Sequence, residues 1–159
     1  MKKIFIILIF LQTVYCEENG INKNLLLSCD KGEDNACFKI GEKYARGNNV
    51  DKNYEIAIKY FIKSCNLGNI EASYKLGIIY VMGRKNRKKA VKFYTIACDS
   101  NHGKACNNLG ALYKYGKYGV TKDYKKALEL FDKACKSEDG VEKGCTNKEE
   151  LEELIKANK

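Results

Sequence analysis

The chain has 159 residues, a formal net charge of +9 and a hydrophobic share of 45%, which suits about one domain with a buried core. It contains no proline, so the strongest helix breaker is missing, as is typical of a mostly helical protein. The positive charge is spread along the chain except at Arg84–Lys89, which fits either a solvated loop or a contact for an anionic cell-surface polymer. No nucleic-acid-binding motif accompanies it, so we predict no nucleic-acid partner.

The first 16 residues have the pattern of a secretory signal peptide. Lys2 and Lys3 precede an unbroken apolar run from Ile4 to Leu11. The run is too short to cross a bilayer, which takes about 20 apolar residues. We predict cleavage after Cys16, and the alternative is a lipoprotein in which Cys16 is lipidated. The protein is therefore expected in the periplasm or outside the cell, and not as an integral membrane protein.

Two sequence patterns alternate through the middle of the chain. The first, aliphatic-Gly-x-x-Tyr-x-x-Gly, begins at Ile40, Leu76 and Leu109. The second begins with Ala, carries an aromatic residue near its middle and ends in Cys, over residues 57–65, 90–98 and 127–135. Gly41, Gly77 and Gly110 are separated by 36 and 33 residues, the period of helix-turn-helix solenoids.

The spacing within each pattern favours helices. One helical face contains residues at i, i+4 and i+7, and this is the spacing of Ile40, Tyr44 and Gly47. We therefore expect the repeated tyrosines in the core. A glycine in the middle of a helix lowers helix stability by about 1 kcal/mol relative to alanine. Its recurrence at one register indicates a close helix–helix contact. We therefore expect an all-α fold, an α-α superhelix of stacked helix-turn-helix repeats. Its parts would be a signal peptide at 1–16, an N-terminal capping helix at 17–32, three repeats at 33–138 and a C-terminal capping helix at 139–159.

The cysteines follow the repeats, and in an exported chain eight of them indicate disulfides. The predicted bridges each join the end of one helix to the start of the next: Cys29–Cys37, Cys98–Cys106 and Cys135–Cys145. Cys65 has the same register, but Ser73 occupies its partner position, so we expect Cys65 outside this scheme. It would be a buried inert thiol, or else a site of intermolecular bridging or oxidation. The spacings are not C-x-x-C and His102, expected to be exposed in the Cys98–Cys106 turn, is the only histidine, so we predict no metal site and no cofactor.

Together these motifs resemble a known family. Leu-Gly-x-x-Tyr-x-x-Gly followed by Lys-Ala-x-x-x-Phe/Tyr-x-x-Ala-Cys resembles the Sel1-like repeat, a relative of the tetratricopeptide repeat, and the cysteine spacing is similar to that of exported Helicobacter cysteine-rich proteins. The resemblance covers about Cys29 to Cys145. It implies an exported superhelical α-α stack. Members of the resembled family are often described as penicillin-binding proteins with weak β-lactamase activity, and they are linked to host interaction.

No active-site motif supports the enzymatic alternative. Residues Ser28 to Lys31 match Ser-x-x-Lys, but neither Ser-Asp-Asn nor Lys-Thr-Gly accompanies them, so no catalytic residue is predicted. Binding is easier to support, because a solenoid lines its concave face with its first helices. The candidate ligand-binding residues are Lys43, Arg46, Lys75, Ile79, Asn107, Asn108 and Lys114. The expected partner is a peptide, a peptidoglycan fragment or a protein, with hydrolysis of a β-lactam or a scaffolding role in the periplasm as alternatives.

Overall fold

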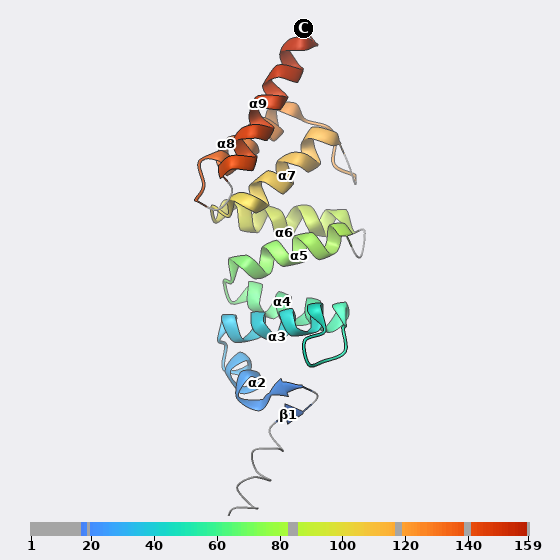
Figure 1. The fold of residues 1–159 in the computed structure, drawn as a ribbon, viewed down its shortest axis with the longest axis vertical. Coiled ribbons are helices and arrows are strands. Elements are labelled where there is room, and N and C mark those ends of the chain that lie inside the picture. Colours follow the sequence, from blue (N-terminus) through green and yellow to red (C-terminus); the bar gives the residue numbers. More distant parts are fainter. Residues whose placement is uncertain (1–16, 19, 83–85, 117–118, 139–140, 159) are drawn as a thin grey trace, which may run out of the picture. The chain divides into compact units, whose positions relative to one another are not determined.

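The computed structural model describes residues 17–18, 20–82, 86–116, 119–138 and 141–158 (Figure 1). The predicted signal peptide, including Cys16, lies outside this part of the chain, and so do residues 83–85, which include Arg84 and Lys85 of the basic cluster. The described residues form helices at α2 (Lys23–Asp30), α3 (Asp34–Arg46), α4 (Tyr54–Asn66), α5 (Ile70–Met82), α6 (Arg87–Asp99), α7 (Gly103–Tyr115), α8 (Tyr124–Cys135) and α9 (Val141–Ala157). Strands β1 (Glu17–Glu18) and β2 (Ile21–Asn22) make a short antiparallel pair. The prediction of an all-α repeat fold is confirmed.

Unit 1 ends at Asn69 and contains α2, α3 and α4. Helix α3 packs against both neighbours, and the core includes Ile21, Cys37 and Ile40. The N-terminal segment differs from the single helix expected at 17–32, because α2 begins only at Lys23. The side chain of Asn22 accepts a hydrogen bond from the backbone N–H of Asn24 at 2.7 Å and so caps the helix. The strand pair before it brings Ile21 into the core.

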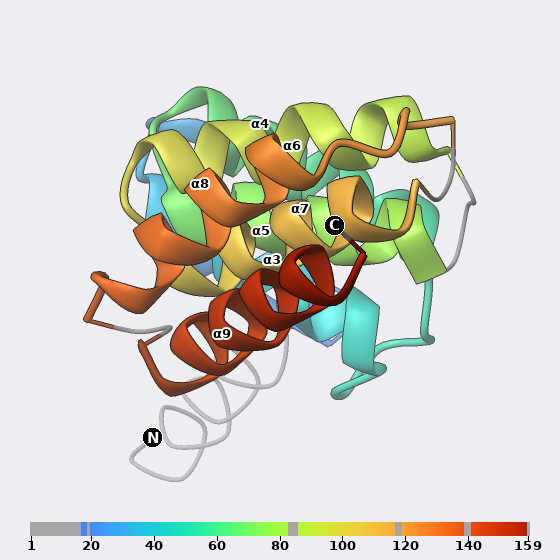
Figure 2. The same cartoon turned by 90° about the horizontal axis from the view of Figure 1, so that it is seen from above.

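Unit 2 runs from Ile70 and contains α5 to α9. Successive helices pack as antiparallel neighbours, and α7 also contacts α5 and α9, the helices at the equivalent place in the adjoining repeats. Figure 2 shows α9 lying beside α7 and α8. Its Leu151 is fully buried with Ala127 and Phe131 of α8. The C-terminal helix therefore takes the place that the first helix of a further repeat would occupy.

Three disulfides fasten the helix junctions. They are Cys29–Cys37 in unit 1 and Cys98–Cys106 and Cys135–Cys145 in unit 2, with Cα atoms 4.7, 4.7 and 4.6 Å apart. All three pairs agree with the predicted register. Cys65 belongs to none of these bridges and is half-buried in α4, while Ser73 is buried in α5.

The repeated glycines have the two roles that their positions suggested. Gly47 and Gly116 end α3 and α7 in the left-handed conformation, with φ of 78° and 59°. Gly110 in the middle of α7 lies against the ring of Phe131, and a Cβ added there would stand 2.7 Å from a ring carbon. The corresponding contacts are Gly41 with Phe61 and Gly77 with Tyr94. An aromatic ring of the second helix thus fills the space above each mid-helix glycine.

Candidate functional site

The predicted binding residues of unit 1 lie on α3. Lys43 is half-buried, and Arg46 is exposed at the end of the helix. The Arg46 guanidinium donates to the Glu42 carboxylate at 2.8 Å, which is a surface i, i+4 pair. A role of these two residues in ligand binding stays a prediction.

The predicted binding residues of unit 2 make internal contacts. Asn107 and Lys114 are only 6% and 8% exposed, because α9 covers this side of α7. The Asn147 amide donates to Asn107 Oδ1 at 2.6 Å, and Lys114 Nζ lies 3.4 Å from the Glu150 carboxylate. These two side chains therefore hold α9 in place.

The other three candidates are on α5 and α7. Lys75 forms an ion pair with Glu71 at 3.3 Å, and Ile79 is buried. The Asn108 amide donates to the Tyr94 hydroxyl at 3.4 Å. Ligand binding by these residues stays a prediction, and their polar groups already have partners inside unit 2.

Unit 2 has a row of exposed apolar side chains that was not predicted from the sequence. Met82, Tyr115 and Leu154 are 77%, 56% and 39% exposed, and they belong to α5, α7 and α9. Met82 follows Ser73 by nine residues, Tyr115 follows Cys106 by nine, and Leu154 follows Cys145 by nine. The three side chains therefore occupy equivalent positions on adjacent first helices. We call Met82, Tyr115 and Leu154 the apolar row. Alignment of the cysteine positions is the sequence signal that finds it.

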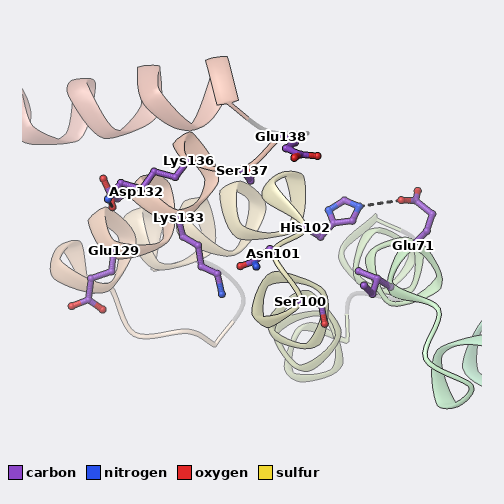
Figure 3. Close-up of a pocket in the computed structure, with 11 residues that line it drawn as sticks. Glu71, Ser100, Asn101, His102, Glu129, Asp132, Lys133, Lys136, Ser137 and Glu138 are labelled. Carbon is purple, nitrogen blue, oxygen red and sulfur yellow. Dashed lines mark hydrogen bonds and ion pairs between the residues drawn. The ribbon is translucent and has the colours of Figure 1, made fainter.

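Unit 2 also contains a cavity of about 820 Å³ (Figure 3). The N-terminus of α5, the turn between α6 and α7, and the C-terminal half of α8 supply its walls. The lining residues are Ile70, Glu71, Ser100, Asn101, His102, Glu129, Asp132, Lys133, Lys136, Ser137 and Glu138. Only one of these is a large apolar residue, so the cavity suits a hydrophilic ligand.

Several contacts hold the His102 side chain in the wall of the cavity. The expectation that it would be exposed is wrong. Its side chain is 11% exposed and its ring stacks on Tyr74 with centroids 4.5 Å apart. Nδ1 accepts the backbone N–H of Ala105 at 3.2 Å, so His102 is the N-cap of α7. Nε2 lies 3.0 Å from the Glu71 carboxylate, which assigns the ring proton of the neutral form to Nε2.

This arrangement makes His102 structural. Burial alone would raise the pKa of the Glu71 carboxyl, but hydrogen bonds from His102 and Lys75 outweigh it and hold that pKa below its usual value. A general base needs an imidazole lone pair within reach of a substrate proton. The Nδ1 lone pair of His102 is occupied by the Ala105 N–H, so the pair with Glu71 joins α5 to the α6–α7 turn.

The described residues assemble no metal site, and they do not bring both residues of the Ser-x-x-Lys match to one cavity. No group of three His, Cys, Asp or Glu residues among them is placed to hold a metal ion. In unit 1, Ser28 lines a second cavity of about 490 Å³ together with Glu33 and Lys39. Lys31, the other residue of the Ser-x-x-Lys match, caps the end of α2 and does not line that cavity. Within the same part of the chain, no helix is long and apolar enough to cross a membrane.

The Sel1 repeat family model matches residues 34–69, 70–102 and 103–139. This chain belongs to the Sel1 repeat family. Two solved structures support the assignment. A Sel1 repeat protein from Oxalobacter formigenes is 27% identical with a TM-score of 0.70, over 80% of this chain and 96% of that one. The Helicobacter pylori cysteine rich protein B is 28% identical with a TM-score of 0.59, over 78% of this chain and 89% of that one. Among curated proteins, no sequence match is found.

Proposed function

We propose that this Sel1 repeat protein is an exported, disulfide-stabilised interaction module that binds a peptide segment of a partner protein. Three bridges in the described chain are the pattern of an oxidising compartment, either the periplasm or the extracellular space. The similarity to the Helicobacter pylori cysteine rich protein B supports export. The predicted signal peptide at 1–16 agrees with it.

The apolar row carries the proposal. Scattered exposed apolar residues need no explanation, but three at one register of neighbouring helices form an ordered surface. Packed helices lie about 8–10 Å apart, so the row offers contacts at roughly that spacing. A polyproline II peptide rises about 3.1 Å per residue and repeats its face every three residues, about 9 Å. The expected ligand is therefore an extended peptide with apolar side chains at every third position.

A displayed random-peptide library selected against the oxidised, mature chain tests this. We expect enriched peptides with apolar residues three apart. In fluorescence anisotropy, Tyr115→Ser and Met82→Ser should each weaken binding about tenfold, because burial of such a side chain contributes about 1.5–3 kcal/mol.

Ile96 provides the matched control, since it is 38% exposed in the same unit but lies on the second helix α6. Ile96→Ser should leave the affinity unchanged. Peptides without the three-residue spacing, or equal losses in all three variants, would contradict binding at the apolar row.

Slow β-lactam hydrolysis is the second candidate function. It is supported by the family resemblance and by the position of Ser28 in the wall of a cavity that Lys39 also lines. Nitrocefin turnover by the oxidised protein that disappears in Ser28→Ala, with the thermal transition unchanged, would establish it. No turnover, or turnover that survives in Ser28→Ala, rejects that site. Recovery of a stable envelope assembly with the protein would instead support a scaffolding role.

A further inference from the structure

We propose that the cavity of unit 2 binds a small zwitterionic ligand, an amino acid or short hydrophilic peptide, with its carboxylate at Lys133 and its ammonium group at Glu138. The site is separate from the apolar row and does not depend on the function proposed above. A volume of about 820 Å³ lies within the range of small-molecule sites and accommodates a few residues of peptide.

Several charges of the cavity are already neutralised by protein partners. Glu71 is held by His102 and Lys75, and the Asp132 carboxylate by Lys136 at 2.6 Å. Lys148 of α9 approaches the other Asp132 oxygen at 2.7 Å, and the hydrogen bonds from Lys136 and Lys148 lower the pKa of Asp132. These groups shape the walls and have little charge left for a ligand. Glu129 keeps its charge, but in Figure 3 it lies on the far side of Lys133 from His102 and Glu138.

Among the described residues that line the cavity, Lys133 is the cation that remains for a ligand. Its ammonium stands 4.0 Å from Asp99, the outer limit of an ion pair, and its side chain is 37% exposed. In Figure 3 it extends from α8 toward Asn101. An incoming carboxylate would gain a charge-assisted hydrogen bond that Asp99 does not make at this distance.

Glu138 supplies the opposite charge. It is exposed beyond the end of α8 and lies on the His102 side of the cavity in Figure 3. Within the described chain, neither an ion pair nor a hydrogen bond engages its carboxylate. A cationic group on one side and an anionic group on another favour a ligand that carries both charges over a simple anion or cation.

Asn101 gives the cavity a neutral hydrogen-bonding group at an unusual backbone position. Its φ is 64°, in the left-handed region, whereas Gly32 and Gly68 hold the equivalent position three residues after Cys29 and Cys65, with φ of 92° and 97°. Asparagine tolerates this conformation less well than glycine. In exchange it places an amide in the cavity wall, and no protein group in the described chain hydrogen-bonds that amide.

Triglycine is a suitable probe because it is a zwitterion without apolar side chains. We expect it to shift the backbone amide NMR signals of Asn101, His102 and Lys133 in the oxidised, mature chain. Amidation of its carboxyl group and acetylation of its amino group should each weaken binding about tenfold, the effect of losing one hydrogen bond to a charged group.

Two variants connect each end of the ligand to its residue. In Lys133→Gln, triglycine should bind about tenfold more weakly and amidation should cause no further loss. In Glu138→Gln, acetylation should cause no further loss. Equal binding of the capped and uncapped peptides to the wild-type protein would overturn the proposal. It would also be overturned if amidation weakened binding to Lys133→Gln, or acetylation weakened binding to Glu138→Gln, as much as it does for the wild-type protein.

Asn101→Gly separates binding from folding. Glycine holds this left-handed backbone position after Cys29 and Cys65, so the variant should be at least as stable as the wild-type protein while binding triglycine several-fold more weakly. Asn49→Gly is the matched control, since Asn49 also has a positive φ, 57°, but lies in unit 1 and does not line the cavity. Unchanged binding in Asn101→Gly, or an equal loss in Asn49→Gly, would count against the site.

Discussion

Substitution of Gly110 by Ala tests whether the repeated glycines exist for close helix contact. An added Cβ would stand 2.7 and 2.8 Å from two ring carbons of Phe131 and 3.3 Å from the carbonyl oxygen of Ala127. Carbon atoms in good contact are about 3.5–4.0 Å apart, so the ring must retreat by about 1 Å. Phe131 is 1% exposed, which leaves it little space to do so.

The magnitude follows from two opposing effects. Overpacking a core costs about 1–3 kcal/mol, while replacing a mid-helix glycine by alanine gains about 1 kcal/mol. Because both the ring and the Ala127 backbone are close, we expect a net loss of about 1–2 kcal/mol in the free energy of unfolding. For a chain of this size, that lowers the melting temperature by roughly 3–6 °C.

A double-mutant cycle read by urea unfolding identifies the cause. In the Phe131→Leu background the ring is gone, so Gly110→Ala should be neutral within about 0.5 kcal/mol, which gives a coupling of about 1 kcal/mol or more. An equal loss in both backgrounds, or a gain in the wild-type background, would refute the explanation by ring contact.

The remaining predictions concern His102 and Tyr94. His102→Ala should destabilise the protein by about 1–2 kcal/mol in thermal unfolding, because it removes the α7 N-cap and the Glu71 contact. His102→Asn keeps a capping oxygen and should recover about half of the lost stability. Equal losses of stability in both variants would count against the cap. Burial raises the pKa of Tyr94 to about 12, against the opposing effect of the hydrogen bond from Asn108. The unfolded phenol loses its proton near pH 10 while the folded one keeps it, so Tyr94 should lower stability by about 2 kcal/mol as the pH rises from 10 to 12. Spectrophotometric titration of Tyr94→Phe should lack the highest tyrosine step of the wild-type protein, and an unchanged titration would contradict the assignment.

Local regularities made much of this fold predictable. The spacing of Leu109, Tyr113 and Gly116 gives one helical face and its end, and the eight-residue intervals of Cys29–Cys37 and Cys98–Cys106 are closed within a single helix-turn-helix. Such features depend on neighbours a few residues away, and the sequence displays them directly. The second helix of each repeat follows from the same logic.

Contacts between distant residues were not predictable in this way. Lys114 looked like a groove residue because its partner Glu150 is 36 residues away, on a helix whose docking the repeat pattern does not specify. His102 looked like an exposed turn residue because Glu71 lies 31 residues earlier. The cavity depends on three separate segments of unit 2, so no single motif marks it. The apolar row could have been predicted by aligning α9 with the first helices of the repeats at Cys145.

Disulfide mapping of the exported protein tests the central claim most directly. The mature chain, alkylated without reduction and then digested, should yield the linked pairs Cys29–Cys37, Cys98–Cys106 and Cys135–Cys145. Fully alkylated cysteines in protein recovered from outside the cytoplasm, or bridges between cysteines of helices that do not follow one another in the chain, would contradict an exported stack of locally fastened helix pairs.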